Sequence, residues 1–340
     1  MTAVEFDRVS IVFGNSPDLA LPLMDKGMSR SDIQTQTGQV LGVHDCSLTV
    51  SEGEILVLMG LSGSGKSTLL RGVNALNPVV RGEVRVSDGT KMVSVTKADP
   101  DTLRTLRLSR VAMVFQQFGL LPWRTVRDNV GLGLELAGQT PEQRKAKVDE
   151  QLALVNLSQW AERRVGELSG GMQQRVGLAR AFATDAPILL MDEPFSALDP
   201  LIRARLQDEL LDLQAKLKRT IIFVSHDLDE AFKLGNRIAL MEGGRIVQIG
   251  TAREIIANPV SEYVADFVAH MNPLGVLTAR DVMEHGETSA AAAIDCELPV
   301  KQVMDLLSKG VTELAVTDQG QKIGVVRANS LMAKLIKPQM

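Results

Sequence analysis

The sequence of 340 residues contains only two cysteines, Cys46 and Cys296. Two cysteines cannot build a disulfide framework or a cluster of metal-binding thiolates, so a disulfide-stabilised secreted domain and a zinc module are both excluded. We expect both thiols to be reduced, as they would be in a cytoplasmic compartment.

The chain also lacks an excess of positive charge and a long apolar segment. Its 37 Lys and Arg residues are outnumbered by 41 Asp and Glu residues, and the isoelectric point is near 5.7. Nucleic-acid binders normally carry a basic stripe, so we expect no nucleic-acid partner. No apolar run approaches the roughly 18 residues that span a bilayer, and the acidic first residues do not resemble a signal peptide. A membrane role would therefore require a separate membrane-embedded partner.

What the sequence does contain is an alternating pattern of strands and helices. Hydrophobic residues make up 45% of the chain, and its length suits about two domains. Short apolar runs bounded by turn residues, such as 55–59 and 188–191, predict strands buried on both faces of a parallel sheet. Their alternation with helical segments predicts an α/β fold with a mostly parallel sheet. Residues from about 117 to 180 have only helical patterns and predict an inserted helical subdomain.

One loop follows the strand predicted at 55–59 and fits the phosphate-binding pattern GxxxxGK[ST]. Glycines let backbone amides approach phosphate oxygens, and the start of the following helix attracts the same anion. Lys66 would reach the β and γ phosphates of ATP, and Ser67 would bind Mg²⁺. The alternative, a chance Gly/Ser-rich turn, leaves the strand before it and the helix after it unexplained. The loop residues are Gly60, Leu61, Ser62, Gly63, Ser64, Gly65, Lys66, Ser67 and Thr68.

Two acids end the apolar run at 188–191. Ligands of parallel α/β folds bind at the carboxyl ends of the strands, where Asp192 and Glu193 would lie. Asp192 would hold Mg²⁺ directly or through water, and Glu193 would be the base that polarises the attacking water. The alternative is a solvated pair of strand-end acids, which the phosphate loop makes less attractive.

The stretch Leu168 to Arg175 reads LSGGMQQR. With it the chain resembles ABC-type ATPases, whose signature is LSGGQ, over residues from about 4 to 270. Ser169 would cap a helix, and with Gly170 and Gly171 it would aim free amides at an anion. The resemblance implies that this loop contacts the γ-phosphate bound by the opposite subunit. Met172 replaces the usual glutamine there; the alternative for the whole stretch is a simple helix cap.

The same resemblance implies roles for four further residues. Gln116 matches the glutamine that senses Mg²⁺ and the membrane subunit, and Asp199 ends the segment Ser-Ala-Leu-Asp that matches the D-loop. His226 matches the switch histidine, although a histidine after a strand can be purely structural. Phe13 is the candidate ring for stacking on adenine, with an ordinary core phenylalanine as the alternative.

The resemblance implies partners as well as cofactors. The chain has one phosphate loop and one signature, so it would pair head to tail with a second copy and hold two ATP molecules between the subunits. Residues 119–126 would begin a groove for an integral membrane permease, unless Trp123 is a core residue instead. A periplasmic solute-binding protein would be an indirect partner, and the chain would lie on the cytoplasmic face of the inner membrane.

A finer resemblance concerns the transported solute. The insertion at 17–38 and the segments 41–43, 135–138 and 271–277 resemble importers for glycine betaine, proline betaine, carnitine and choline, and look most like a choline importer ATPase. Histidine importers share much of this pattern. A soluble ABC ATPase of DNA repair or translation, or a non-catalytic nucleotide-binding regulator, would be an alternative from another class.

The last segment, residues 276–340, predicts a small α+β tail after a boundary at 270–275. It resembles a single regulatory motif of the cystathionine-β-synthase type, with strands at 312–316 and 323–326 and helices at 300–307 and 329–335. Two alternatives stay open: a regulatory module that senses ionic strength or nucleotide, and a brace between two subunits.

Overall fold

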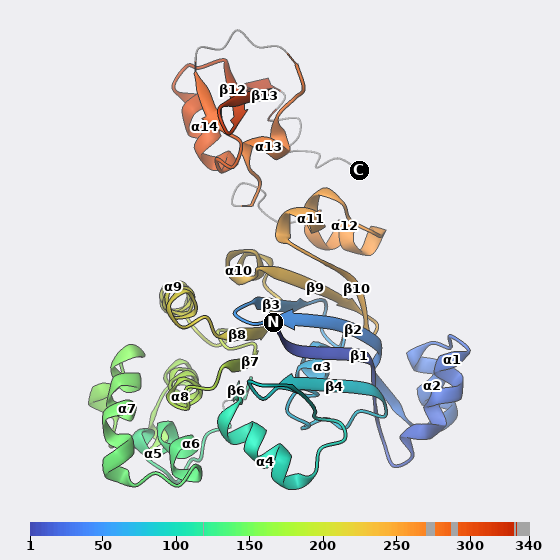
Figure 1. Cartoon of the computed structure of the whole chain (residues 1–340), viewed down its shortest axis with the longest axis vertical. Helices are drawn as coiled ribbons and strands as arrows, with labels where there is room; N and C mark the ends of the chain where they lie inside the picture. Colours follow the sequence, from blue (N-terminus) through green and yellow to red (C-terminus); the bar gives the residue numbers. More distant parts are fainter. Residues whose placement is uncertain (118, 270–275, 287–291, 330, 332–340) are drawn as a thin grey trace. The chain divides into compact units, whose positions relative to one another are not determined.

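The computed structural model describes residues 1–117, 119–269, 276–286, 292–329 and 331. The chain divides into two compact units, one made of Met1–His226 with Ala239–Val247, and the other of Asp227–Ile238 with Gln248–Met340 (Figure 1). The predicted boundary at 270–275 lies outside the described residues. The segments 227–238 and 248–269, which the sequence assigned to the ATPase domain, group with the tail.

A six-stranded sheet forms the centre of the fold, in the order β10-β9-β3-β8-β7-β6. The pairs β3–β8, β8–β7 and β7–β6 are parallel, so the predicted mostly parallel core is confirmed. Every residue of β3, β7 and β8 is buried, as their continuous apolar sequences require. The bounds are β3 Ile55–Met59, β6 Val111–Val114, β7 Ile188–Asp192, β8 Thr220–Val224, β9 Arg237–Glu242 and β10 Arg245–Gly250.

A second, antiparallel sheet has the order β2-β1-β4-β5. The long strands β1 and β2 pair along their whole length, with Phe13 opposite Val40, and both of these residues line the cavity described below. The bounds are β1 Thr2–Phe13, β2 Val40–Ser51, β4 Arg81–Ser87 and β5 Met92–Ser94.

Helices of the first unit follow the buried strands. Helix α3, Lys66–Leu70, begins at the phosphate loop. Asp99 caps α4 by accepting from two backbone amides, and Asp199 caps α9 in the same way from the amide of Ile202. The bounds are α4 Pro100–Ser109 and α9 Pro200–Leu217.

The inserted helical subdomain has a hydrophobic core of its own. Buried residues from Val126 to Ala183 form this core, which begins later than the predicted range of 117–180 and ends three residues beyond it. Figure 1 shows its green helices on one side of the first unit and the blue α1 and α2 on the other. The bounds are α5 Val126–Val130, α6 Leu132–Leu136, α7 Pro141–Leu154, η2 Ser158–Trp160, η3 Val165–Glu167 and α8 Gly170–Ala183.

Three short helices fill the insertion between β1 and β2. They are η1 Pro17–Ala20, α1 Leu21–Asp25 and α2 Arg30–Thr37. Ser29 caps α2 by accepting from the amide of Asp32, and Gly38 ends it with φ of +68°.

The second unit contains a three-stranded sheet, in the order β11-β12-β13. Strands β12 and β13 form the predicted antiparallel pair, and α14 matches the predicted helix at 300–307, whereas most of the helix predicted at 329–335 lies outside the described residues. None of the helices in the part of the chain that the structure describes has the length and apolar character needed to cross a membrane. The bounds are α10 Leu228–Leu234, α11 Ala252–Ala257, α12 Glu262–Ala269, α13 Ala279–Val282, β11 Ala293–Asp295, α14 Val300–Ser308, β12 Glu313–Asp318 and β13 Gln321–Arg327.

Candidate nucleotide-binding site

The phosphate loop connects β3 to α3 in a conformation that requires glycine at two positions. Gly60 has φ of +141°, and a Cβ there would lie 2.1 Å from the carbonyl oxygen of Met241. Gly65 has φ of +100°, and its Cβ would lie 2.6 Å from the carbonyl oxygen of Gly42. Side chains are therefore excluded on both sides of the loop, which leaves its backbone close to the place where a phosphate would bind.

Lys66 begins α3 and is buried within its own loop. Its ammonium donates to the carbonyl oxygens of Gly60, at 2.7 Å, and Leu61, at 2.9 Å, and lies 3.5 Å from Ser64 Oγ. Burial lowers the pKa of Lys66, and the carboxylates of Glu193 and Asp192 oppose this effect. A cation held by neutral oxygens at the start of a helix is well placed to bind an anion.

Asp192 is completely buried at the end of β7 and bonds to the helix that follows the phosphate loop. Its Oδ1 accepts from Ser67 Oγ at 2.6 Å, and its Oδ2 accepts from Arg71 Nη2 at 2.8 Å. The sequence predicted that Ser67 and Asp192 act on one ion, and the structure places them in direct contact. Arg71 was not predicted, because nothing in its sequence context marks it.

Glu193 lies beside the two other residues predicted to act in hydrolysis. Its Oε2 accepts from Gln116 Nε2 at 3.2 Å and lies 3.4 Å from His226 Nδ1. The Glu193 side chain is 18% exposed and that of His226 is 63% exposed, so the carboxylate is partly accessible to solvent. Residues from β6, β7 and β8 thus meet at the carboxyl edge of the parallel sheet.

The backbone of Glu193 is held in an unusual conformation. Its φ is +47°, which is unfavourable for a residue with a side chain. Its amide donates to Val224, and its carbonyl oxygen accepts from Gln174 Nε2 at 3.2 Å and from Ser196 Oγ at 3.0 Å. Gln174 also accepts from the Ala197 amide at 3.2 Å and is 1% exposed. Sequence analysis missed Gln174, although it stands within the signature.

Lys66, Ser67, Gln116, Glu193 and His226 line one cavity of about 550 Å³, which Asp192 and Gln174 do not line. Phe13 lies on its wall and is 37% exposed, so the alternative of a core phenylalanine does not hold. Gly60 and Ser64, which the sequence also predicted to bind the nucleotide, are not among the lining residues. The cavity is lined by Phe13, Arg30, Val40, Gly42, Ser62, Gly63, Gly65, Lys66, Ser67, Thr68, Gln116, Glu193 and His226.

The signature loop is not part of this cavity. Ser169 caps α8 by accepting from the Met172 amide at 3.4 Å, and Ser169 and Gly170 are exposed. Met172 packs against the core of the helical subdomain, and a Cβ on Gly171 would lie 3.4 Å from Leu198. The predicted signature residues Ser169, Gly170, Gly171 and Met172, together with Asp199, therefore do not line the cavity with Lys66 in one chain.

Comparison with known proteins identifies the family. The family model described as ABC transporter matches residues 43–196. The glycine betaine/proline betaine transport system ATP-binding protein ProV of Salmonella typhimurium is 46% identical over 338 residues, which are 99% of this chain and 83% of the relative. The chain belongs to the ABC transporter family of ATP-binding proteins. It is an ABC-type ATPase, with the ABC ATPase fold.

Other known proteins resemble parts of this ABC ATPase. The choline transport ATP-binding protein OpuBA of Bacillus subtilis is 40% identical over 236 residues, which cover 69% of this chain and 60% of the relative. A solved structure of the ATP-binding cassette MJ0796, described as a dimeric post-hydrolysis state bound to ADP and Pi, has a TM-score of 0.63 and 30% identity. It covers 74% of this chain and 99% of its own.

Trp123 of the ABC ATPase lies on the surface of the helical subdomain. Its side chain is 68% exposed, so the alternative of a core tryptophan is wrong. Pro122 beside it is also exposed. An exposed tryptophan at the start of an inserted subdomain is a candidate contact for another protein.

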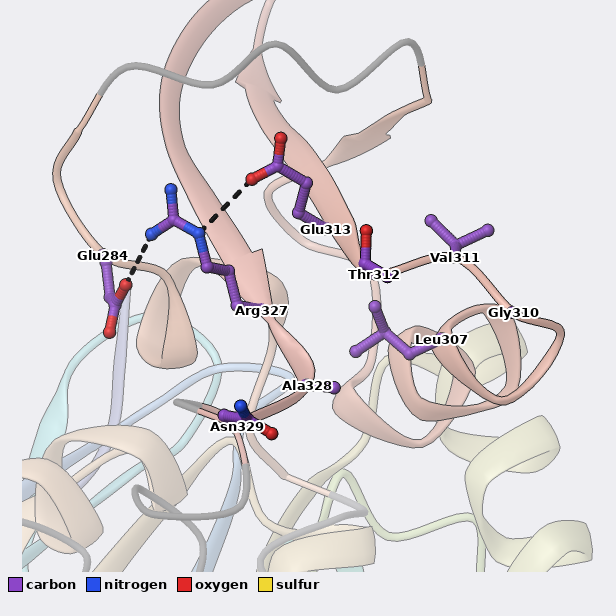
Figure 2. Close-up of a pocket in the computed structure, with 9 residues that line it drawn as sticks. All are labelled: Glu284, Leu307, Gly310, Val311, Thr312, Glu313, Arg327, Ala328 and Asn329. Atoms are coloured by element: carbon purple, nitrogen blue, oxygen red, sulfur yellow. Dashed lines mark hydrogen bonds and ion pairs between the residues drawn. The ribbon is translucent and has the colours of Figure 1, made fainter.

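A second cavity lies within the tail and has a volume of about 750 Å³. Figure 2 shows Arg327 on its wall between two carboxylates, with Nη1 2.9 Å from Glu284 and Nε 3.3 Å from Glu313. The nonpolar side chains of Leu307, in α14, and of Val311, which follows α14, line the other side (Figure 2). The tail thus has a mixed, partly charged cavity that the sequence did not predict.

Proposed function

We propose that this ABC ATPase powers the import of glycine betaine, proline betaine and related quaternary amines. The observation that carries the solute class is the identity of 46% with the betaine transport protein ProV, sustained over 99% of the chain. Choline, which the sequence resemblance favoured, has less support, because the choline transport relative matches only 69% of the chain.

ATP hydrolysis is proposed to occur at the cavity around Lys66. The phosphate loop and Lys66 would hold the β and γ phosphates, and Phe13 would contact the adenine. Glu193 would orient and deprotonate the attacking water, and His226 and Gln116 would position that carboxylate through their contacts of 3.4 and 3.2 Å. Phosphoryl transfer needs positioning and charge rather than covalent catalysis, and the cavity provides both.

The residues at the end of β7 also fit the predicted Mg²⁺. The Ser67 hydroxyl, the Asp192 carboxylate and the Gln116 amide offer the oxygen ligands that this ion prefers. Because both Asp192 oxygens accept hydrogen bonds from protein groups, we propose that Asp192 binds the ion through water. When bound, Mg²⁺ would neutralise charge on the phosphates.

A second copy of the chain is proposed to complete each ATP site. The exposed Ser169 and Gly170 and the half-buried Gly171 lie outside the cavity of their own subunit, as a group serving another subunit would. The solved structure of MJ0796, which is described as a dimer, supports this arrangement. ATP would close the dimer and hydrolysis would open it, which gives a ligand-driven two-state switch.

The dimer is proposed to act on an integral membrane permease from the cytoplasmic face of the membrane. Trp123, which is 68% exposed, would lie in the contact with the permease. A periplasmic solute-binding protein would deliver the solute to the permease. The tail would regulate the ATPase or brace the dimer, and its cavity of about 750 Å³ favours the regulatory alternative.

Uptake measurements test the solute. Cells that produce the chain with its permease should accumulate labelled glycine betaine, and cells carrying Glu193→Gln should not, because that variant keeps the shape of the side chain but loses the base. Labelled choline offered at the same concentration should enter more slowly. Equal or faster choline uptake would contradict the betaine assignment and restore the choline one.

Removal of the tail tests the last proposal. A chain that ends before residue 276 should transport at low salt but lose the response of transport to rising salt, because the regulatory module is gone. An unchanged salt response together with a weaker dimer would leave only the bracing role.

A further inference from the structure

The insertion between β1 and β2 is a fixed part of the first unit with a small core of its own. Val12, Ala20, Met24, Ile33 and Leu41 are buried in that core. A segment that buries this much apolar surface holds its polar side chains in defined places.

Polar contacts also fasten the insertion to the sheet. Asp25 forms a bidentate ion pair with Arg81 of β4, at 2.5 and 3.0 Å. The Gln39 side chain accepts from the Ser16 amide at 3.1 Å and packs against Gly14, where a Cβ would lie 2.0 Å from its Oε1. The insertion is therefore anchored in its middle and at its two ends, and the ends adjoin Phe13 and Val40, which line the nucleotide cavity.

Arg30, the first residue of α2, reaches from the insertion to the phosphate loop. Its Nη1 donates to the carbonyl oxygen of Gly63 at 2.8 Å. Its Nε donates to Leu41 at 2.8 Å, and its Nη2 donates to Leu41 at 2.5 Å and to Gly42 at 3.2 Å. The planar guanidinium thus bridges β2 and the phosphate loop, which a lysine ammonium could not do in the same way.

Arg30 also lines the nucleotide cavity, on a wall that includes Phe13, Gly63 and Thr68. Lys66 is the other Lys or Arg residue among those that line it. Within the described part of the chain, the contacts of Arg30 use four of its five guanidinium N–H groups. One N–H group on Nη1 is left for a ligand.

We propose that Arg30 is a nucleotide-binding residue which the insertion delivers to the ATP site. Its positive charge attracts the polyphosphate, and the remaining N–H donates to a phosphate or ribose oxygen of the nucleotide. It also fixes the Gly63 carbonyl, and therefore the loop, before the nucleotide arrives. The inference rests on the proposed ATP-binding function and adds a residue to that site from outside the predicted motifs.

Equilibrium binding of ATP and ADP to the full chain tests the proposal. Arg30→Ala should weaken the binding of both nucleotides by about tenfold, as expected for the loss of a charged hydrogen bond. The turnover number should change by less than twofold, because the residue acts on binding and not on the chemical step. Arg30→Lys keeps the cation but not the bridge, and should bind ATP at least threefold more weakly than the unmodified chain.

Lys26→Ala is the matched control, because Lys26 is an exposed cation of the same insertion and does not line the cavity. It should bind ATP within twofold of the unmodified chain. The role of Arg30 would be overturned if Arg30→Ala bound ATP as tightly as the unmodified chain does. It would also be overturned if Lys26→Ala weakened ATP binding as much as Arg30→Ala does. If Arg30→Ala does not fold, as its melting curve will show, Arg30→Lys decides: ATP binding equal to that of the unmodified chain would overturn the proposal. Absence of ATP binding by the unmodified chain would instead overturn the proposed function itself.

Discussion

Replacement of Gln174 by leucine should slow ATP hydrolysis although Gln174 is outside the nucleotide cavity. The Gln174 amide donates to the Glu193 carbonyl oxygen and accepts from the Ala197 amide, both at 3.2 Å. It therefore holds the proposed base in a backbone conformation with φ of +47°, which costs a residue with a side chain about 1–2 kcal/mol. Without this contact the backbone of Glu193 can relax toward a negative φ and carry the carboxylate away from Gln116 and His226.

The magnitude follows from the two lost hydrogen bonds. At a buried site each contributes about 1 kcal/mol net, so the free energy of unfolding should fall by about 2 kcal/mol. The turnover number should fall about tenfold, which corresponds to about 1.4 kcal/mol of the activation barrier. The affinity for ATP should stay within twofold, because Gln174 does not line the cavity.

Steady-state ATPase kinetics, equilibrium ATP binding and thermal unfolding together provide the assay. Gln151→Leu is the control, because Gln151 is a buried glutamine of α7 that belongs to the helical subdomain and does not line the nucleotide cavity. It should leave the turnover number unchanged. A folded Gln174→Leu variant that hydrolyses ATP at the normal rate would refute the positioning argument.

Two further predictions concern other parts of the first unit. Burial raises the pKa of Cys46 to about 11 from its ordinary value of 9.0, so its thiol should resist iodoacetamide at pH 8. The thiol ionises in the unfolded chain from about pH 9 but stays protonated in the folded chain, so the folded state should lose stability as the pH rises. Relative to Cys46→Ala, the free energy of unfolding measured in urea should fall by about 2 kcal/mol between pH 8 and pH 10.5. Trp123→Ala should leave the ATPase of the isolated chain unchanged but reduce transport by the assembled importer several-fold, whereas the exposed Leu136→Ala should not; unimpaired transport by Trp123→Ala would remove it from the permease contact.

Local sequence patterns were enough to predict the centre of the fold. The apolar run Ile55–Met59 is a buried strand with the predicted bounds, because five consecutive apolar residues between turns suit a strand covered on both faces. The meeting of Ser67, Asp192 and Glu193 could also be anticipated, since parallel strands present their carboxyl ends at one edge. Those predictions needed only strand direction and loop chemistry.

The remaining features depend on contacts between distant segments. Gln174 contacts Glu193 because α8 passes beside the end of β7, and no local pattern encodes that approach. Arg30 stands in a polar helix whose sequence gives no sign of the phosphate loop 33 residues further on. The exposure of Trp123 likewise follows from how the helical subdomain packs, and the grouping of 248–269 with the tail follows from tertiary contacts.

The central claim is that the phosphate loop of one subunit and the signature loop of another bind the same ATP. The most direct test measures the molecular mass of Glu193→Gln in solution with ATP and Mg²⁺ by light scattering. We expect twice the chain mass of 36.9 kDa with ATP, the single mass without it, and no dimer when Ser169→Arg is added to the same chain. A variant that stays monomeric with ATP bound, or a dimer that forms equally well with Ser169→Arg, would contradict the account.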